Sequence, residues 1–184
     1  MKKSLIVASL LLVGGSALVA AEGSGWYTGI EAGNTKMDFS MSALGVSSSG
    51  DTDGSSATLK VGYYFDANQR ASTWYHKIKK ADGVDKAEAY GLNYDYLFGT
   101  SAFKPFLGAV VGYQSYKEAE LKLNGLVYGA QAGLNYAMTS NLSAEIGYRY
   151  LISNADDNIV VLGIPVKVEA DKIKTWYVGL NYKF

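Results

Sequence analysis

The stretch KTWYVGLNYKF at residues 174–184 alternates strictly between two kinds of side chain. Successive side chains of a β-strand point to opposite faces, so this stretch would present two different surfaces. One face carries only apolar or aromatic residues, namely Trp176, Val178, Leu180, Tyr182 and Phe184. The other carries Thr175, Tyr177, Gly179, Asn181 and Lys183. This pattern predicts a β-strand with one face against an apolar environment.

The same period of two recurs through the chain, and no stretch after Glu22 shows a sustained helical period. The other predicted strands are WYTGIEAG (26–33), ATLKVGYYF (57–65), RASTWYHK (70–77), YGLNYDYLF (90–98), PFLGAVVGYQ (105–114), LVYGAQAGLNY (126–136) and LSAEIGYRY (142–150). The stretch at 70–77 gives no clear choice of face. Together the segments predict an all-β protein with eight strands.

Short and long connections alternate between these strands. The short ones span residues 66–69, 99–102 and 139–141, and the long polar ones span 40–56, 77–86, 117–124 and 153–171. The first long connection is rich in Ser and Gly and is expected to be a mobile loop. Asn124-Gly125 predicts a hairpin turn that leads into the sixth strand. Residues 159–168, around Gly163-Ile164-Pro165, predict a hairpin above the barrel, with ten strands as the alternative count.

This alternation is typical of a transmembrane antiparallel up-and-down β-barrel, with short turns at one end and long loops at the other. Residues 22–184 leave about 20 residues for each of eight strands with its connection, which is enough to span a bilayer at a tilt. A soluble eight-stranded barrel would need many charges outside, whereas the polar face here consists mainly of Gly, Asn, Gln and Thr. Aromatic residues at strand ends also fit the girdles of a membrane barrel.

Composition and the N-terminus agree with an exported protein. The chain has 184 residues, 17 basic and 17 acidic side chains, no Cys, 21 Gly and 15 Tyr. Lys2 and Lys3 precede an apolar run at residues 5–13, which predicts a signal peptide at 1–21, cleaved to leave one domain at 22–184. The absence of charge bias argues against a nucleic-acid partner, and the absence of Cys excludes disulfides and thiolate sites.

Several of these segments resemble the small outer-membrane β-barrel family typified by the transmembrane domain of OmpA. The resemblance rests on WYTGIEAG, on KPFLGAVVGY at 104–113, on EIGYRY at 145–150 and on the terminal Phe184. It implies a porin-like barrel in the outer membrane of a Gram-negative cell envelope. It also implies that Trp176, Val178, Leu180, Tyr182 and Phe184 form the signal read by the assembly machinery. Peptidoglycan tethering is not carried over, because the chain stops at Phe184.

The alternation assigns a set of charged residues to the barrel interior: Glu31, Lys60, Asp95, Glu145 and Arg149. A charge on the lipid face would cost a few kcal/mol, about 2–4 for Lys or Arg at the midplane. Glu31 and Lys60 are the best candidate pair, because they lie on adjacent strands at similar depth. Glu145 and Arg149 are about 13 Å apart along one strand and need partners across the lumen. Lys183 is expected near the periplasmic rim.

These features predict a non-enzymatic protein without cofactor or metal. The leading hypothesis is a structural or surface-interaction role through the long loops, the second is a narrow pore for ions or small solutes, and a lipid-modifying enzyme is the weakest. The sole histidine, His76, is expected at the rim or in a loop. Asp51, Asp53, Asp156 and Asp157 are expected at solvated loop tips. The expected partners are outer-membrane lipid, lipopolysaccharide and the assembly machinery, and the expected state is a monomer.

Overall fold

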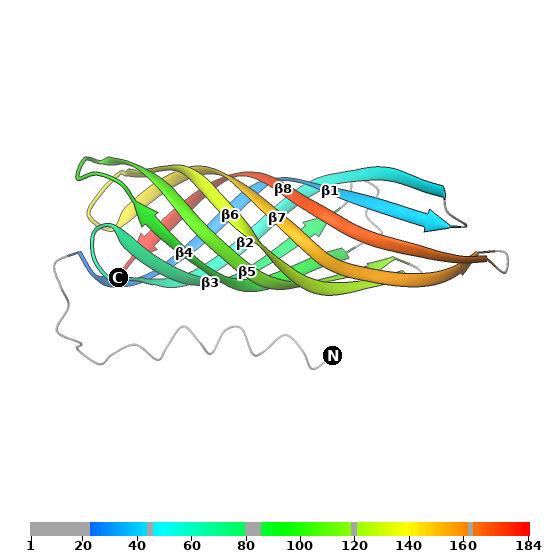
Figure 1. Ribbon diagram of the computed structural model, residues 1–184. Helices are drawn as coiled ribbons and strands as arrows, with labels where there is room; N and C mark the ends of the chain where they lie inside the picture. Colours follow the sequence, from blue (N-terminus) through cyan, green and yellow to red (C-terminus); the bar gives the residue numbers. More distant parts are fainter. Residues whose placement is uncertain (1–22, 44–45, 80–85, 119–120, 162–163) are drawn as a thin grey trace, which may run out of the picture.

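The computed structural model describes residues 23–43, 46–79, 86–118, 121–161 and 164–184. Its strands are β1 (Gly25–Ala43), β2 (Val46–Tyr64), β3 (Gln69–Lys79), β4 (Lys86–Leu97), β5 (Phe103–Glu118), β6 (Leu121–Ala137), β7 (Leu142–Val161) and β8 (Ile164–Lys183). Each strand pairs antiparallel with its neighbours in sequence, and β8 closes on β1, giving one closed barrel (Figure 1). The predicted all-β barrel of eight strands is confirmed.

The outer wall carries the predicted apolar faces. Trp26, Ile30, Leu59, Leu92 and Val178 are about half exposed, while the residues between them on each strand are mostly buried in the lumen. Aromatic side chains gather outside near both ends. Those toward the long connections are Tyr75, Tyr90, Tyr113, Tyr128, Tyr150 and Trp176, and those toward the short turns include Trp26, Phe65, Phe98, Phe103, Tyr182 and Phe184. Such girdles flank the apolar band of a membrane barrel.

Pairing decides the face of β3, which sequence alone left open. Arg70 is paired with Asp95 on β4, and Trp74 with Lys60 on β2. Because paired residues share one face of the sheet, Arg70, Ser72, Trp74 and His76 point into the lumen.

The long connections are mainly paired strands, which corrects the expectation of a mobile loop at residues 40–56 and agrees with the hairpin expected at residues 159–168. β1 and β2 stay paired as far as Ala43 and Val46, and β7 and β8 as far as Val161 and Ile164. These two ribbons extend furthest at the end opposite the C-terminus (Figure 1). The β1–β2 pairing keeps the register of the barrel wall, whereas the β7–β8 pairing shifts its register between Ile152 and Ala155.

One local turn prediction is wrong, whereas the hairpin predicted at residues 159–168 is present. Asn124 and Gly125 lie inside β6, paired with Ser115 and Gln114, so they do not form the turn. At Asn124-Gly125 the register set by the barrel overrides a local turn signal. Residues 159–161 of β7 pair with residues 164–166 of β8, so this segment forms the predicted hairpin and the alternative count of ten strands is excluded.

The predicted signal peptide, residues 1–21, lies outside the described residues. The end of the barrel that holds the short turns also holds the C-terminus (Figure 1). Within the part of the chain that the structure describes, no helix is long and apolar enough to cross a membrane.

The lumen also contains apolar side chains. The larger cluster, called the apolar cluster below, consists of Met37, Trp74, Ile78, Ala89, Val110, Val127, Leu151 and Ile173. A second cluster consists of Leu97, Phe106 and Tyr177. Inward aromatic residues face glycines on the neighbouring strand. The pairs are Tyr27 with Gly62, Trp74 with Gly91, Phe106 with Gly133 and Tyr177 with Gly147. The missing Cβ gives each ring room to lie across the lumen.

Candidate functional site: the closed lumen

Six charged side chains converge in the middle of the lumen from five strands. Glu31 comes from β1, Lys60 from β2, Arg70 from β3, Asp95 from β4, and Glu145 and Arg149 from β7. Each is at most 4% exposed, so water hardly reaches this layer. With three acids and three bases the set is neutral, as buried charges must be to offset their desolvation.

Lys60 joins the two carboxylates on either side of it. Its Nζ lies 2.8 Å from Glu31 Oε1 and also contacts Glu145 Oε1. The other oxygen of Glu145, Oε2, accepts a hydrogen bond of 2.9 Å from Arg70 Nη2. Arg70 Nε in turn donates to Asp95 Oδ2 at 2.9 Å. Glu145 is therefore shared by two cations from two different strands.

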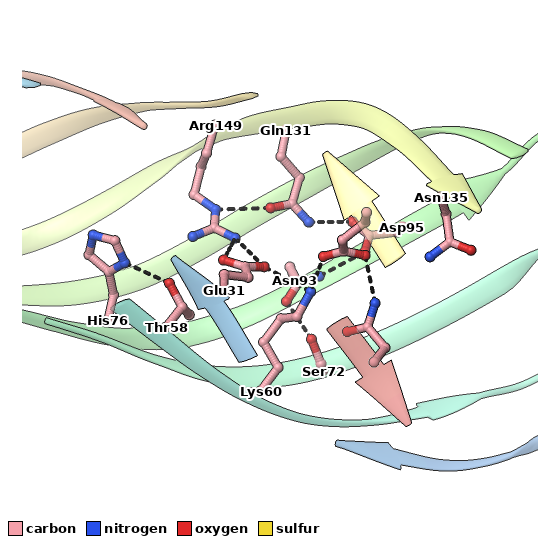
Figure 2. Close-up of polar contacts among 12 residues, drawn as sticks. Glu31, Thr58, Lys60, Ser72, His76, Asn93, Asp95, Gln131, Asn135 and Arg149 are labelled. Carbon is pink, nitrogen blue, oxygen red and sulfur yellow. Dashed lines mark hydrogen bonds and ion pairs between the residues drawn. The ribbon is translucent and has the colours of Figure 1, made fainter. Parts of the chain in front are cut away.

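Gln131 of β6 closes this chain of contacts into a ring (Figure 2). Its amide Nε2 donates to Asp95 Oδ1 at 2.6 Å, and its Oε1 accepts from Arg149 Nε at 2.9 Å. Arg149 Nη2 then reaches Glu31 Oε2 at 3.1 Å. The ring runs through Glu31, Lys60, Glu145, Arg70, Asp95, Gln131 and Arg149. We call these seven residues the charge ring.

The charge ring contains all five residues assigned to the interior from sequence. Glu31 and Lys60 lie in contact, while Glu145 and Arg149 bind partners on other strands and not each other. Sequence reasoning missed Arg70, because the face of its strand was ambiguous. Arg70 pairs with Asp95 across β3 and β4. Because paired residues share one face, the inward assignment of Asp95 together with this pairing could have placed Arg70 inside as well.

Aromatic rings and amides hold the two guanidinium groups. Arg70 Cζ lies 5.3 Å from the centroid of Phe106, and Arg149 Cζ lies 5.0 Å from that of Tyr177. Asn181 Nδ2 donates to Glu145 Oε2 at 2.8 Å. These contacts limit the movement of the buried side chains.

His76 lies inside the lumen, which corrects its expected place at the rim. It is 5% exposed, and its Nδ1 lies 2.8 Å from Thr58 Oγ1 (Figure 2). Its Nε2 lies 3.3 Å from Thr35 Oγ1. The inward register of β3 puts it there, next to the apolar cluster. A cavity of about 20 Å³ beside it has room for about one water molecule.

A larger cavity of about 190 Å³ opens at the short-turn end. Tyr27, Tyr64 and Leu97 lie on its inner side, and Lys104 and Lys183 line it as well. Lys183 Nζ donates to the Gly23 carbonyl at 3.2 Å. We call this cavity, which lies between the short turns and the charge ring, the vestibule.

The four aspartates expected at loop tips all lie in strands. Asp51 and Asp53 belong to β2, and Asp51 Oδ2 lies 2.9 Å from Lys36 Nζ. The hydrogen bond to Asp51 raises the pKa of Lys36 above its usual value. Asp156 and Asp157 belong to β7, and their side chains lie outside the described part. Among the described residues no group of three acids or histidines could hold a metal ion.

Comparison with known proteins identifies the family. Residues 5–184 match the model of the outer membrane protein beta-barrel domain. The chain belongs to this family.

Solved members of the same fold agree with the assignment. The chain is similar to neisserial surface protein A (NspA), with 23% identity, a TM-score of 0.63, and 88% of this chain and 99% of that chain covered. It is also similar to OprG from Pseudomonas aeruginosa, with 19% identity, a TM-score of 0.61, and 91% and 99% covered. The N-terminal barrel domain of OprF from the same organism gives 15% identity, a TM-score of 0.53, and 86% and 97% covered. No curated protein sequence matches the chain significantly.

Family membership confirms that this is a small β-barrel protein of the bacterial outer membrane. The outer wall of the barrel therefore contacts lipid. The side chains at Trp176, Val178, Leu180, Tyr182 and Phe184, predicted to be the assembly signal, all point outward and are 45–66% exposed.

Proposed function

We propose that residues 22–184, released from a signal peptide at 1–21, form a non-enzymatic barrel that supports the outer membrane and presents β-ribbons at the cell surface. The observation that carries this proposal is the filled lumen. The charge ring and the apolar cluster above it occupy the interior of an eight-stranded barrel, which has room for little beyond side chains. The protein then acts through its outer surfaces.

The ribbons offer the surface for interaction. β3 ends at Lys79, which pairs with Ser55, so no described residue of β3 pairs with residues 46–54 of β2. β1 pairs with β2 on the other side of the same stretch. An unpaired strand edge presents free backbone donors and acceptors, which extended peptides can bind.

Adhesion of bacterial cells to host-cell layers and matrix proteins tests the surface role. A variant with residues 40–49 replaced by a two-residue Asn-Gly turn removes the end of the β1–β2 ribbon and keeps the charge ring. At equal surface abundance, the trimmed variant should adhere markedly less than the full chain. Equal adhesion by the trimmed variant and the full chain would contradict a role for this ribbon. The structural role is tested separately: cells that lack the protein should lose resistance to detergent.

A narrow pore is the second candidate, and the shared contacts of Lys60 favour it. Lys60 already binds two carboxylates, so exchange of partners could open a path between the vestibule and the upper lumen. Enzymatic activity has little support, because within the described part of the chain both ring nitrogens of His76 lie against threonine hydroxyls in a closed interior. We further propose a monomer that contacts lipopolysaccharide and is inserted by the assembly machinery through its C-terminal signal.

A further inference from the structure

The aromatic girdle near the long-connection end is interrupted on two strands. Tyr148, Trp176, Asn34 and Ser55 pair successively across β7, β8, β1 and β2, so they lie on one rung of the barrel. The first two are aromatic, but Asn34 and Ser55 are polar and exposed. Polar side chains thus replace the interfacial aromatic residues on β1 and β2.

Directly below this gap the outer wall is hollowed. Ala32 and Ala57 pair with each other one step below Asn34 and Ser55, and both are exposed. A groove of about 850 Å³ runs over them and is lined also by Ile30, Leu59, Val178 and Lys77. Its volume lies in the range of about 300–1,000 Å³ that is typical of small-ligand sites. We call it the wall groove.

Lys77 places a positive charge at the upper edge of the wall groove. It pairs with Ala57 across the β2–β3 ladder, so it is the diagonal neighbour of Ser55. Its Nζ lies 4.0 Å from Glu88 Oε1, and both side chains are more than a third exposed. This separation is at the limit of an ion pair and leaves the ammonium able to bind another anion.

We propose that the wall groove binds a phosphorylated lipid of the outer leaflet. The acyl chains would lie over Ala32 and Ala57, and a headgroup phosphate would accept hydrogen bonds from Lys77, Ser55 and Asn34. A basic residue at a membrane surface attracts anionic headgroups in this way. The proposal depends on the outer-membrane location and not on adhesion by the ribbons or on the state of the lumen.

A second groove on the same barrel provides a matched control. Its volume is about 520 Å³, and it is lined by Trp26, Val61, Ala71, Leu92, Ala109 and Val111 among others. Its lining includes no Lys or Arg. This second groove should accept acyl chains without selecting for phosphate.

Native mass spectrometry of the refolded barrel with defined lipids tests the site. The probes are bisphosphorylated lipid A, its dephosphorylated form and phosphatidylethanolamine. The wild type should bind the bisphosphorylated lipid most tightly. Lys77→Gln should weaken this binding about fivefold, while Lys77→Arg should restore most of it. Ala57→Phe should fill the groove and weaken binding of bisphosphorylated lipid A further, whereas Ala109→Phe in the second groove should not.

Heat-dependent gel mobility would confirm that each variant is folded before its lipid binding is compared. Lys172→Gln, which removes an exposed charge on β8, controls for net charge and should leave binding unchanged. The proposal is overturned if folded Lys77→Gln binds bisphosphorylated lipid A as tightly as the wild type. It is also overturned if dephosphorylated lipid A binds equally well or if Ala109→Phe weakens binding as much as Ala57→Phe.

Discussion

At the scale of single residues, Glu145 carries the most connections in the lumen. It contacts Lys60 and Arg70, and also accepts from Asn181. All of these groups are buried, so each charge is stabilised by the polar groups and opposite charges beside it and not by water. Removing one member leaves an uncompensated charge in a medium that cannot solvate it.

Glu145→Gln should therefore lower the free energy of unfolding by about 3–5 kcal/mol, because Lys60 and Arg70 lose a shared counter-charge. Urea unfolding of the barrel in lipid vesicles measures this change. The control is Asp51→Asn, which breaks the exposed pair with Lys36 and should cost at most about 1 kcal/mol. Equal and small effects of both substitutions would contradict a tightly coupled ring.

Gly147 shows how the sequence makes space for a ring inside the barrel. A Cβ at this position would lie 2.5 Å from Cζ of Tyr177, the residue paired with it on β8. Tyr177 also lies beneath Arg149 of the charge ring. The glycine thus allows an aromatic side chain to pack flat between the wall and a buried guanidinium group.

Gly147→Ala should destabilise the barrel by about 1–3 kcal/mol, the usual cost of overpacking a core. Combining it with Tyr177→Leu should remove part of that cost, since the crowded ring is gone. Gly50→Ala is the control, because nothing lies within 4 Å of the Cβ it would add. Urea unfolding in lipid vesicles measures the stability of all three variants. An unchanged free energy of unfolding for Gly147→Ala would refute the packing argument.

At the scale of strands, alternation predicted eight strands and their faces wherever one face was consistently apolar. It could not place β3, where apolar residues fall on both faces, and therefore missed Arg70. It did not predict the β1–β2 ribbon either, because residues 46–54 are rich in Ser, Gly and Asp and lack apolar alternation, whereas the apolar runs around Gly163 did predict the β7–β8 hairpin. The pairing of the β1–β2 ribbon follows from the register of the barrel below, which is a tertiary effect.

Backbone pairing of the ribbons predicts protection from hydrogen exchange. Residues 39–42 of β1 and 167–170 of β8 are paired with each other, so their amides should exchange more slowly than those of an open loop. The short turn at residues 99–102 serves as the rapidly exchanging reference. Exchange of the β1 and β8 amides at the rate of this turn would show that the long connections are loops, as sequence alone had suggested.

At the scale of the whole molecule, the barrel has three regions that differ in the chemistry of their side chains. Its lumen is filled by the charge ring and by apolar side chains, its outer wall meets lipid, and its ribbons stand beyond the aromatic girdle. The family is defined by the shared wall, while the particular role depends on the residues that each member adds to these surfaces. Sequence predicted the wall and most of the charge ring, but its closure through Gln131 needed the three-dimensional contacts.

The closed lumen is the central claim, and single-channel recording of residues 22–184 in a planar bilayer tests it most directly. The folded wild type should give no reproducible conductance steps, because the charge ring and the apolar cluster leave no continuous water path. Arg149→Ala, which removes the link between Glu31 and Gln131, should give steps if the ring alone seals the lumen. It should stay silent if the apolar cluster also seals it. Reproducible steps from the wild-type barrel would contradict a closed lumen and would establish the pore.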